Sequence, residues 1–168
     1  MELLIVRHAI AEDRETFART GKDDDLRPLT PEGRKKMEQA AEGLRKVFPE
    51  LDVLASSPLV RAKETAEIVA KAYGGLDVAI VEDLSPDGDP SAVAHWLRSL
   101  RGKRRVAVVG HNPDLGGLIG WFVTGDDDTT IIELKKGAAC LLELEGPPAP
   151  GEATMLWALT PSQLRQLT

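Results

Sequence analysis

Apolar and polar positions along most of the chain fall into blocks that switch between strand and helix spacing. Short apolar runs, each bounded by polar or turn residues, predict buried β-strands. Longer segments with apolar residues three or four positions apart predict helices that bury one face. The expected strands in the first two thirds of the chain are residues 3–6, 51–56, 78–81 and 105–109.

Helices are expected after each of these strands. The clearest begins at Thr30, where an N-cap residue is followed by Pro31 and Glu32, and it ends before Pro49. The others run from Pro58 to the glycine pair 74–75, over residues 90–100 and over residues 114–123. Strands that alternate with helices predict a parallel sheet covered by helices on both faces.

The pattern changes in the last quarter of the chain. Residues 130–134, 138–144 and 154–159 are strand-like and are expected to add antiparallel or edge strands, and residues 161–167 predict a short helix. No linker, repeat or low-complexity tract divides the chain. We therefore expect a single domain over residues 1–168, a three-layer α/β/α fold with a mostly parallel central sheet.

Residues 11–27 follow neither periodicity, and more than half of them are charged. A solvated loop is expected there, with room for a frayed helix over residues 14–19. Three adjacent aspartates, residues 23–25, make tight packing of this segment unfavourable.

Composition narrows the classes of function. The chain has 21 Lys and Arg against 27 Asp and Glu, a net charge of -6, which disfavours nucleic acid and anionic membranes as partners. Cys140 is the only cysteine, so neither an intramolecular disulfide nor a thiolate zinc site is possible. The chain shows no apolar run of membrane-spanning length and no signal-peptide pattern. These features predict a cytoplasmic protein, which we expect to be a monomer.

Polar residues that could take part in catalysis follow three of the expected strands. Arg7 and His8 follow the first, His111 follows the fourth, and Arg61 lies on the first turn of the helix after the second. The carboxyl ends of parallel strands meet at one edge of a sheet, so these side chains should converge. Guanidinium groups match phosphoryl oxygens, one neutral imidazole can attack phosphorus, and another can stabilise transition-state charge. An anion beside Arg61 would also explain a cation at a helix start.

Three segments resemble the core motifs of the histidine phosphatase superfamily, which includes the cofactor-dependent phosphoglycerate mutases. They are LIVRHA at residues 4–9, SSPLVRAKETA at 56–66 and VGHNP at 109–113. Three further segments are similar to the short SixA-type phosphohistidine phosphatases, and they are RPLTPEG at residues 27–33, LSPDGD at 84–89 and WALTPSQLR at 157–165.

This resemblance implies a phosphoglycerate mutase-like fold and a phosphatase that needs neither a metal nor another cofactor. It implies that His8 is the nucleophile that becomes phosphohistidine, that Arg7 and Arg61 hold the phosphoryl group, and that His111 completes the pocket. The implied substrate is a protein that carries phosphohistidine. A small phosphomonoester or polyphosphate, hydrolysed at the same site, is the alternative.

Two positions depart from the family pattern. Ala9 replaces the usual glycine after the catalytic histidine, and residues 10–12 lack the small polar residue and asparagine of the mutases, which disfavours mutase activity. The general acid of the family is a carboxylic acid after the third strand. That role falls to Asp83, with Glu82 or water as alternatives, and a phosphoramidate can leave without such an acid.

The remaining candidates have simpler interpretations. His95 on an expected helix is interpreted as a structural or surface residue, and the acidic runs 23–25 and 126–128 as solvated loops without a calcium-loop pattern. Metal-dependent hydrolysis through His8, His111 and a carboxylate is disfavoured because the arginines nearby would repel a cation. A non-catalytic phosphate-binding module would not need the histidine nucleophile.

Overall fold

A six-stranded sheet forms the centre of the computed structural model, which describes residues 1–168. The strands are β1 (Glu2–Arg7), β2 (Val53–Ser56), β3 (Val78–Ile80), β4 (Arg105–Gly110), β5 (Ala139–Leu144) and β6 (Ala153–Leu159). Their order across the sheet is β3-β2-β4-β1-β5-β6. The first four strands pair in parallel, whereas β5 is antiparallel to both β1 and β6. The mostly parallel sheet expected from the alternating pattern is confirmed.

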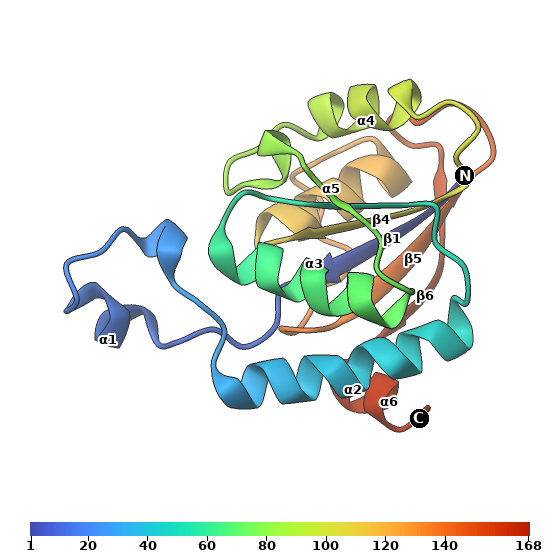
Figure 1. Ribbon diagram of the computed structural model, residues 1–168. Helices are drawn as coiled ribbons and strands as arrows, with labels where there is room; N and C mark the ends of the chain where they lie inside the picture. Colours follow the sequence, from blue (N-terminus) through green and yellow to red (C-terminus); the bar gives the residue numbers. More distant parts are fainter.

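Helices cover both faces of this sheet, as Figure 1 shows, with α4 and α5 on one face and α2 and α3 on the other. The helices are α1 (Arg14–Ala18), α2 (Pro31–Val47), α3 (Val60–Ala72), α4 (Pro90–Ser99), α5 (Asp114–Thr124) and α6 (Pro161–Arg165), with short 3₁₀ turns η1 (Asp24–Leu26) and η2 (Glu82–Leu84). Each face has its own apolar core, so the three-layer arrangement is confirmed. No helix is both long and apolar enough to cross a membrane.

The start of α2 holds the chain just beyond β1 in place. The Thr30 hydroxyl accepts the N–H of Gly33, which caps the helix, and the Thr30 N–H donates to the carbonyl of Ile10 at 3.0 Å. A Cβ at Gly33 would collide with the same Ile10 carbonyl, so only glycine allows this approach. The residues that follow Arg7 are therefore clamped against a long helix.

The prediction of a strand over residues 130–134 is wrong. This stretch is an irregular connection between α5 and β5. Its backbone forms hydrogen bonds with side chains instead of with a neighbouring strand. The carbonyl of Leu134 accepts hydrogen bonds from the side chains of Arg7 and Asn112, both at 2.8 Å. The carbonyl of Thr129 lies so close to Gly120 of α5 that a Cβ there would collide with it. The β-branched residues of this stretch thus cross α5 instead of extending the sheet.

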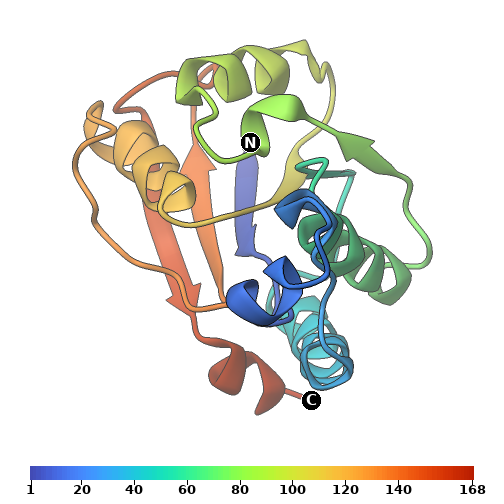
Figure 2. The same cartoon turned by 90° about the vertical axis from the view of Figure 1, so that its left-hand side faces the viewer.

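The charged segment 11–27 is largely exposed, as expected, and α1 lies within the helix expected over residues 14–19, but some side chains of the segment are buried. Asp13 caps α1 and Asp23 caps η1, while Phe17 and Arg27 are each only 6% exposed. Figure 2 shows this blue segment over the sheet edge at which β1 ends. Aspartates of this segment satisfy helix N-termini, and Asp24 also binds arginine side chains, as described below.

Candidate active site

The pairing of β1 with β4 brings the two histidines together. Arg7 lies opposite Gly110 in the parallel register, so His8 and His111 each follow at the same edge of the sheet. Their ring centroids are 5.1 Å apart, and the His8 N–H donates to the carbonyl of Gly110 at 3.0 Å. The convergence expected from the strand ends is present in the structure.

One ring nitrogen of His8 is held by the backbone. Its Nδ1 lies 2.7 Å from the carbonyl oxygen of Ala9. Because a carbonyl can only accept, Nδ1 carries the proton, and Nε2 is left with the free electron pair. The backbone of Ala9 has no positive φ, so the alanine in place of glycine introduces no strain. The ring is thereby fixed in the tautomer that a nucleophilic Nε2 requires.

His111 is held by a side chain instead. Its Nε2 lies 2.6 Å from the hydroxyl oxygen of Ser57, and that oxygen also accepts the N–H of Leu59 at 3.3 Å. The other nitrogen, Nδ1, is buried without a partner. Ser57 was not singled out from the sequence, although it stands within the SSPLVR segment.

The two arginines each keep a buried nitrogen without a partner. Arg7 donates from one terminal nitrogen to Leu134, and Arg61 donates to the Asp24 carbonyl at 3.1 Å, yet the Nε atoms of both are unpaired. The complete set of buried unpaired side-chain atoms is Arg7 Nε, Arg61 Nε, His111 Nδ1 and Asn112 Oδ1. Buried polar groups are normally paired. Their concentration at this edge is typical of a site that binds a ligand rich in acceptors.

The electrostatic environment keeps both imidazoles neutral. Burial, followed by the charges of neighbouring groups, lowers the pKa of His8 to about 3. Burial and the charge of Arg61 lower the pKa of His111 to about 4. Desolvation also lowers the pKa of both Arg7 and Arg61, which stay protonated near neutral pH. Two cations thus flank two neutral rings, which suits an anionic ligand.

Arg27 adds a third guanidinium that the sequence interpretation did not assign to the site. Its Nε lies 2.9 Å from Oδ1 of Asp24, and Oδ2 of the same carboxylate lies 3.4 Å from Arg61. Asp24 therefore bridges two arginines. The signal was the RPLTPEG segment, which begins at Arg27, but nothing in its spacing showed that segment 11–27 folds back over Arg61.

Asp83 lies in η2, beside the end of β4. The carbonyl of Leu84 packs against Gly110, and Pro86 borders an open hollow of about 550 Å³ that Arg61 and Asp24 also line. The Asp83 side chain is half-buried and makes no hydrogen bond, whereas Glu82 is exposed. The segment borders the site, and the role of Asp83 as an acid stays a prediction.

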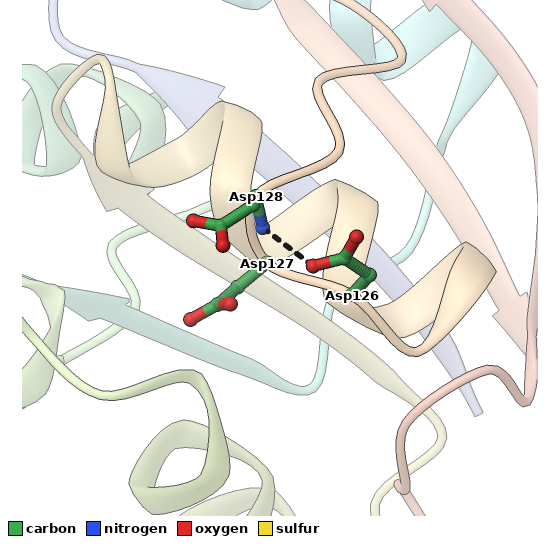
Figure 3. Close-up of side chains that lie close together, drawn as sticks. All are labelled: Asp126, Asp127 and Asp128. Atoms are coloured by element: carbon green, nitrogen blue, oxygen red, sulfur yellow. Dashed lines mark hydrogen bonds between the residues drawn. The ribbon is translucent and has the colours of Figure 1, made fainter.

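Five other candidate residues, namely His95, Cys140 and the aspartates 126–128, lie outside this site. His95 is exposed on α4, and Cys140 is buried in β5, where desolvation raises its pKa to about 12. The carboxylates of Asp126, Asp127 and Asp128 lie within 4.8 Å of one another and are exposed. Figure 3 shows Asp126 turned back to accept the N–H of Asp128, at 2.9 Å. A local turn explains this arrangement.

Comparisons with known proteins identify the family of this chain. A family model described as the histidine phosphatase superfamily (branch 1) matches residues 3–85. An uncharacterised protein of Picosynechococcus is 36% identical over 118 residues, which cover 69% of each chain. The chain belongs to the histidine phosphatase superfamily. Within this superfamily it is of the SixA type, as two further comparisons show.

The phosphohistidine phosphatase SixA of Escherichia coli is 27% identical over 168 residues, which cover 98% of this chain and 97% of SixA. A solved structure of the protein histidine phosphatase SixA with tungstate has a TM-score of 0.83 and 27% identity, and covers 98% of this chain and 99% of that one. The phosphoglycerate mutase-like fold and the phosphatase class expected from the motifs are thus confirmed.

The buried neutral histidines predict that this histidine phosphatase loses stability in acid. The folded-state pKa values of about 3 and about 4 lie below the ordinary 6.5, so the unfolded chain binds protons that the folded chain does not. The free energy of unfolding therefore falls as the pH drops from about 6.5 to about 4. Each pKa unit corresponds to about 1.4 kcal/mol, so the His8 part is on the order of a few kcal/mol.

Urea unfolding of the parent and of His8→Ala, at neutral pH and near pH 4.5, measures this contribution. His8→Ala should lose less stability between the two conditions than the parent. His95→Ala, at an exposed histidine, should keep the parent's pH dependence. An unchanged pH dependence in His8→Ala would show that folding does not lower the pKa of His8.

Proposed function

We propose that this chain, as a single histidine phosphatase domain over residues 1–168, hydrolyses phosphohistidine on a protein through a covalent phosphohistidine on His8. The unprotonated Nε2 of His8, beside the buried unpaired donors of Arg7 and Arg61, is the observation that carries this proposal. The similarity to SixA, whose name states phosphohistidine phosphatase activity, supports the choice of substrate.

The first step transfers the phosphoryl group to the enzyme. The electron pair of His8 Nε2 forms a bond to phosphorus, and the bond from phosphorus to the substrate's imidazole nitrogen breaks. That nitrogen keeps the bonding pair and takes a proton from an acid or from water. Arg7 and Arg61 bind the equatorial oxygens, on which the negative charge spreads.

His111 adds a neutral donor to this set. The Ser57 hydroxyl can donate to Nε2 of His111, which leaves the proton on the unpaired Nδ1. An N–H at Nδ1 stabilises a phosphoryl oxygen without repelling Arg61.

In the second step water attacks phosphorus and loses a proton to solvent or a carboxylate. The bond between phosphorus and Nε2 of His8 breaks, which releases inorganic phosphate and free His8.

The arrangement of charges supports catalysis without a metal. Two guanidiniums supply the positive charge that a divalent cation would otherwise provide, and they would repel such a cation from the same place. The one group of three carboxylate, histidine or cysteine ligands in the structure is the aspartate triplet 126–128, which does not include His8 or His111.

A substrate panel tests the proposal. Phosphate release is measured from a phosphohistidine peptide, polyphosphate and a simple phosphomonoester, each with and without EDTA. We expect the phosphohistidine peptide to have the highest kcat/KM, and EDTA to have no effect. Acid and base quenching during turnover should reveal a base-stable, acid-labile phosphoenzyme. Loss of activity in EDTA with recovery on added metal would replace this mechanism with a metal-dependent one.

Asp83→Asn should separate the substrate classes. If Asp83 protonates a leaving alkoxide, hydrolysis of an alkyl phosphate should slow by about 100-fold or more, the usual size of general acid catalysis. Phosphohistidine should be affected little, because its leaving imidazole is a far weaker base than an alkoxide. Steady-state rates on both substrates give the comparison.

Glu82→Gln is the matched control, since Glu82 is the exposed neighbour in the same turn. It should leave both rates close to the parent's. Equal losses on both substrates in Asp83→Asn would mean that Asp83 shapes the pocket, and a loss confined to Glu82→Gln would transfer the role to Glu82.

A further inference from the structure

The turn before β5 is attached directly to the active site. The carbonyl of Leu134 accepts a hydrogen bond from the guanidinium of Arg7, and the N–H of Gly137 lies 3.1 Å from the carbonyls of both Arg7 and His8. Between these two anchors stand Lys135 and Lys136, and both side chains are exposed. Hydrogen bonds to Arg7 and His8 on either side of the two lysines thus hold them beside the active site.

These lysines belong to a larger cationic surface, which we call the lysine surface and which consists of Lys36, Lys135, Lys136 and Arg165. The four residues line a cavity of about 190 Å³ that Ala9, the residue after His8, also lines. No carboxylate lines this cavity. Its wall thus brings together residues from α2, α6 and the turn before β5.

The charge of the lysine surface is largely unneutralised. Lys36 pairs with Glu32 at 2.9 Å, but no carboxylate lies within ion-pair distance of Lys135, Lys136 or Arg165. The nearest acid along the chain, Glu133, is exposed, and its negative charge raises the pKa of Arg7. A chain with a net charge of -6 has no need of such a surface for solubility. This unpaired positive charge would attract an anionic ligand.

A single phosphoryl group would be bound by Arg7 and Arg61 and has no need of the lysine surface. A ligand that reaches both must be extended and must carry negative charge beyond the reacting phosphorus. A phosphohistidine protein with acidic side chains beside its histidine has this form. We propose that the lysine surface docks an acidic segment of that protein, an inference that rests on the proposed function and names what its substrate presents.

Peptides that differ only in their flanks test this docking. One phosphohistidine peptide carries Glu and Asp beside the histidine, and the other carries Gln and Asn. At low ionic strength the parent should favour the acidic peptide in kcat/KM by about tenfold, the size expected for a few exposed charge pairs. Added salt should remove this preference, since it screens exposed charges.

The double variant Lys135→Glu/Lys136→Glu should lose or reverse the preference and keep its rate on the neutral peptide. Lys103→Glu/Arg104→Glu is the matched control, with the same change in charge at two exposed residues just before β4, at the opposite end of the sheet. This control should keep the preference of the parent. Lys135→Gln/Lys136→Gln should give an intermediate loss, and melting curves should show all variants folded.

Three results would overturn the docking proposal. The first is a preference for the acidic peptide that survives in Lys135→Glu/Lys136→Glu. The second is an equal loss of kcat/KM on both peptides in this variant. The third is a loss of kcat/KM on polyphosphate alone, which would assign the surface to a small polyanion. The same flanks on phosphoserine peptides keep the test independent of the phosphorus linkage. Turnover of phosphoserine peptides alone would refute the proposed function, while the acidic preference would still decide the role of the lysines.

Discussion

Replacing His8 with alanine should lower phosphate release by at least about 10⁴-fold on every substrate, because no other group can form the covalent intermediate. The fold should survive. His8 lies at a strand end, and its ring bonds only to the carbonyl of its neighbour, Ala9. Removal of a buried imidazole with a pKa of about 3 takes away a polar group that was costly to desolvate.

The measurement combines steady-state phosphate release, a melting curve and acid-quench trapping of the phosphoenzyme. His95→Ala provides a histidine control on the exposed surface of α4, and it should keep full activity. If His8→Ala keeps activity within about tenfold of the parent, far less than the loss of a nucleophile costs, the covalent mechanism on His8 is wrong.

Replacing Arg61 with alanine should lower kcat/KM by about 10²- to 10³-fold, the effect of losing one preorganised donor to the transition state. The buried Nε of Arg61 has no protein partner, so its hydrogen bond is available to a phosphoryl oxygen. Arg61→Lys should recover little of the loss, because an ammonium cannot reproduce the planar pair of donors.

Arg61 also contacts Asp24, so the alanine variant could act by releasing segment 11–27. Asp24→Asn separates the two effects, since it weakens the ion pairs of this segment and keeps the guanidinium of Arg61. We expect a smaller loss for Asp24→Asn than for Arg61→Ala. Arg101→Ala, at an exposed arginine, should leave kcat/KM unchanged. Equal losses in Asp24→Asn and Arg61→Ala would assign Arg61 a structural role.

The alternation of strands and helices was determined by the sequence alone, and so was the edge of the sheet that carries the site. Buried parallel strands have short apolar runs, and helices have apolar residues three or four positions apart, so both patterns are local. Arg7, His8 and His111 stand directly after such runs. Once the strands are parallel, their ends meet, and no further information is needed to bring these side chains to one edge.

Only the tertiary structure decided which other segments contact these active-site residues. Residues 130–134 have strand-like side chains but no strand, because their backbone lies against α5 and accepts hydrogen bonds from the side chains of Arg7 and Asn112. Most of segment 11–27 is exposed, as its charges predicted, but Asp24 pairs both with Arg27 and with Arg61 of α3, which is far away in sequence. Pairing partners and ion pairs between distant residues depend on where the chain folds back, which local periodicity does not encode.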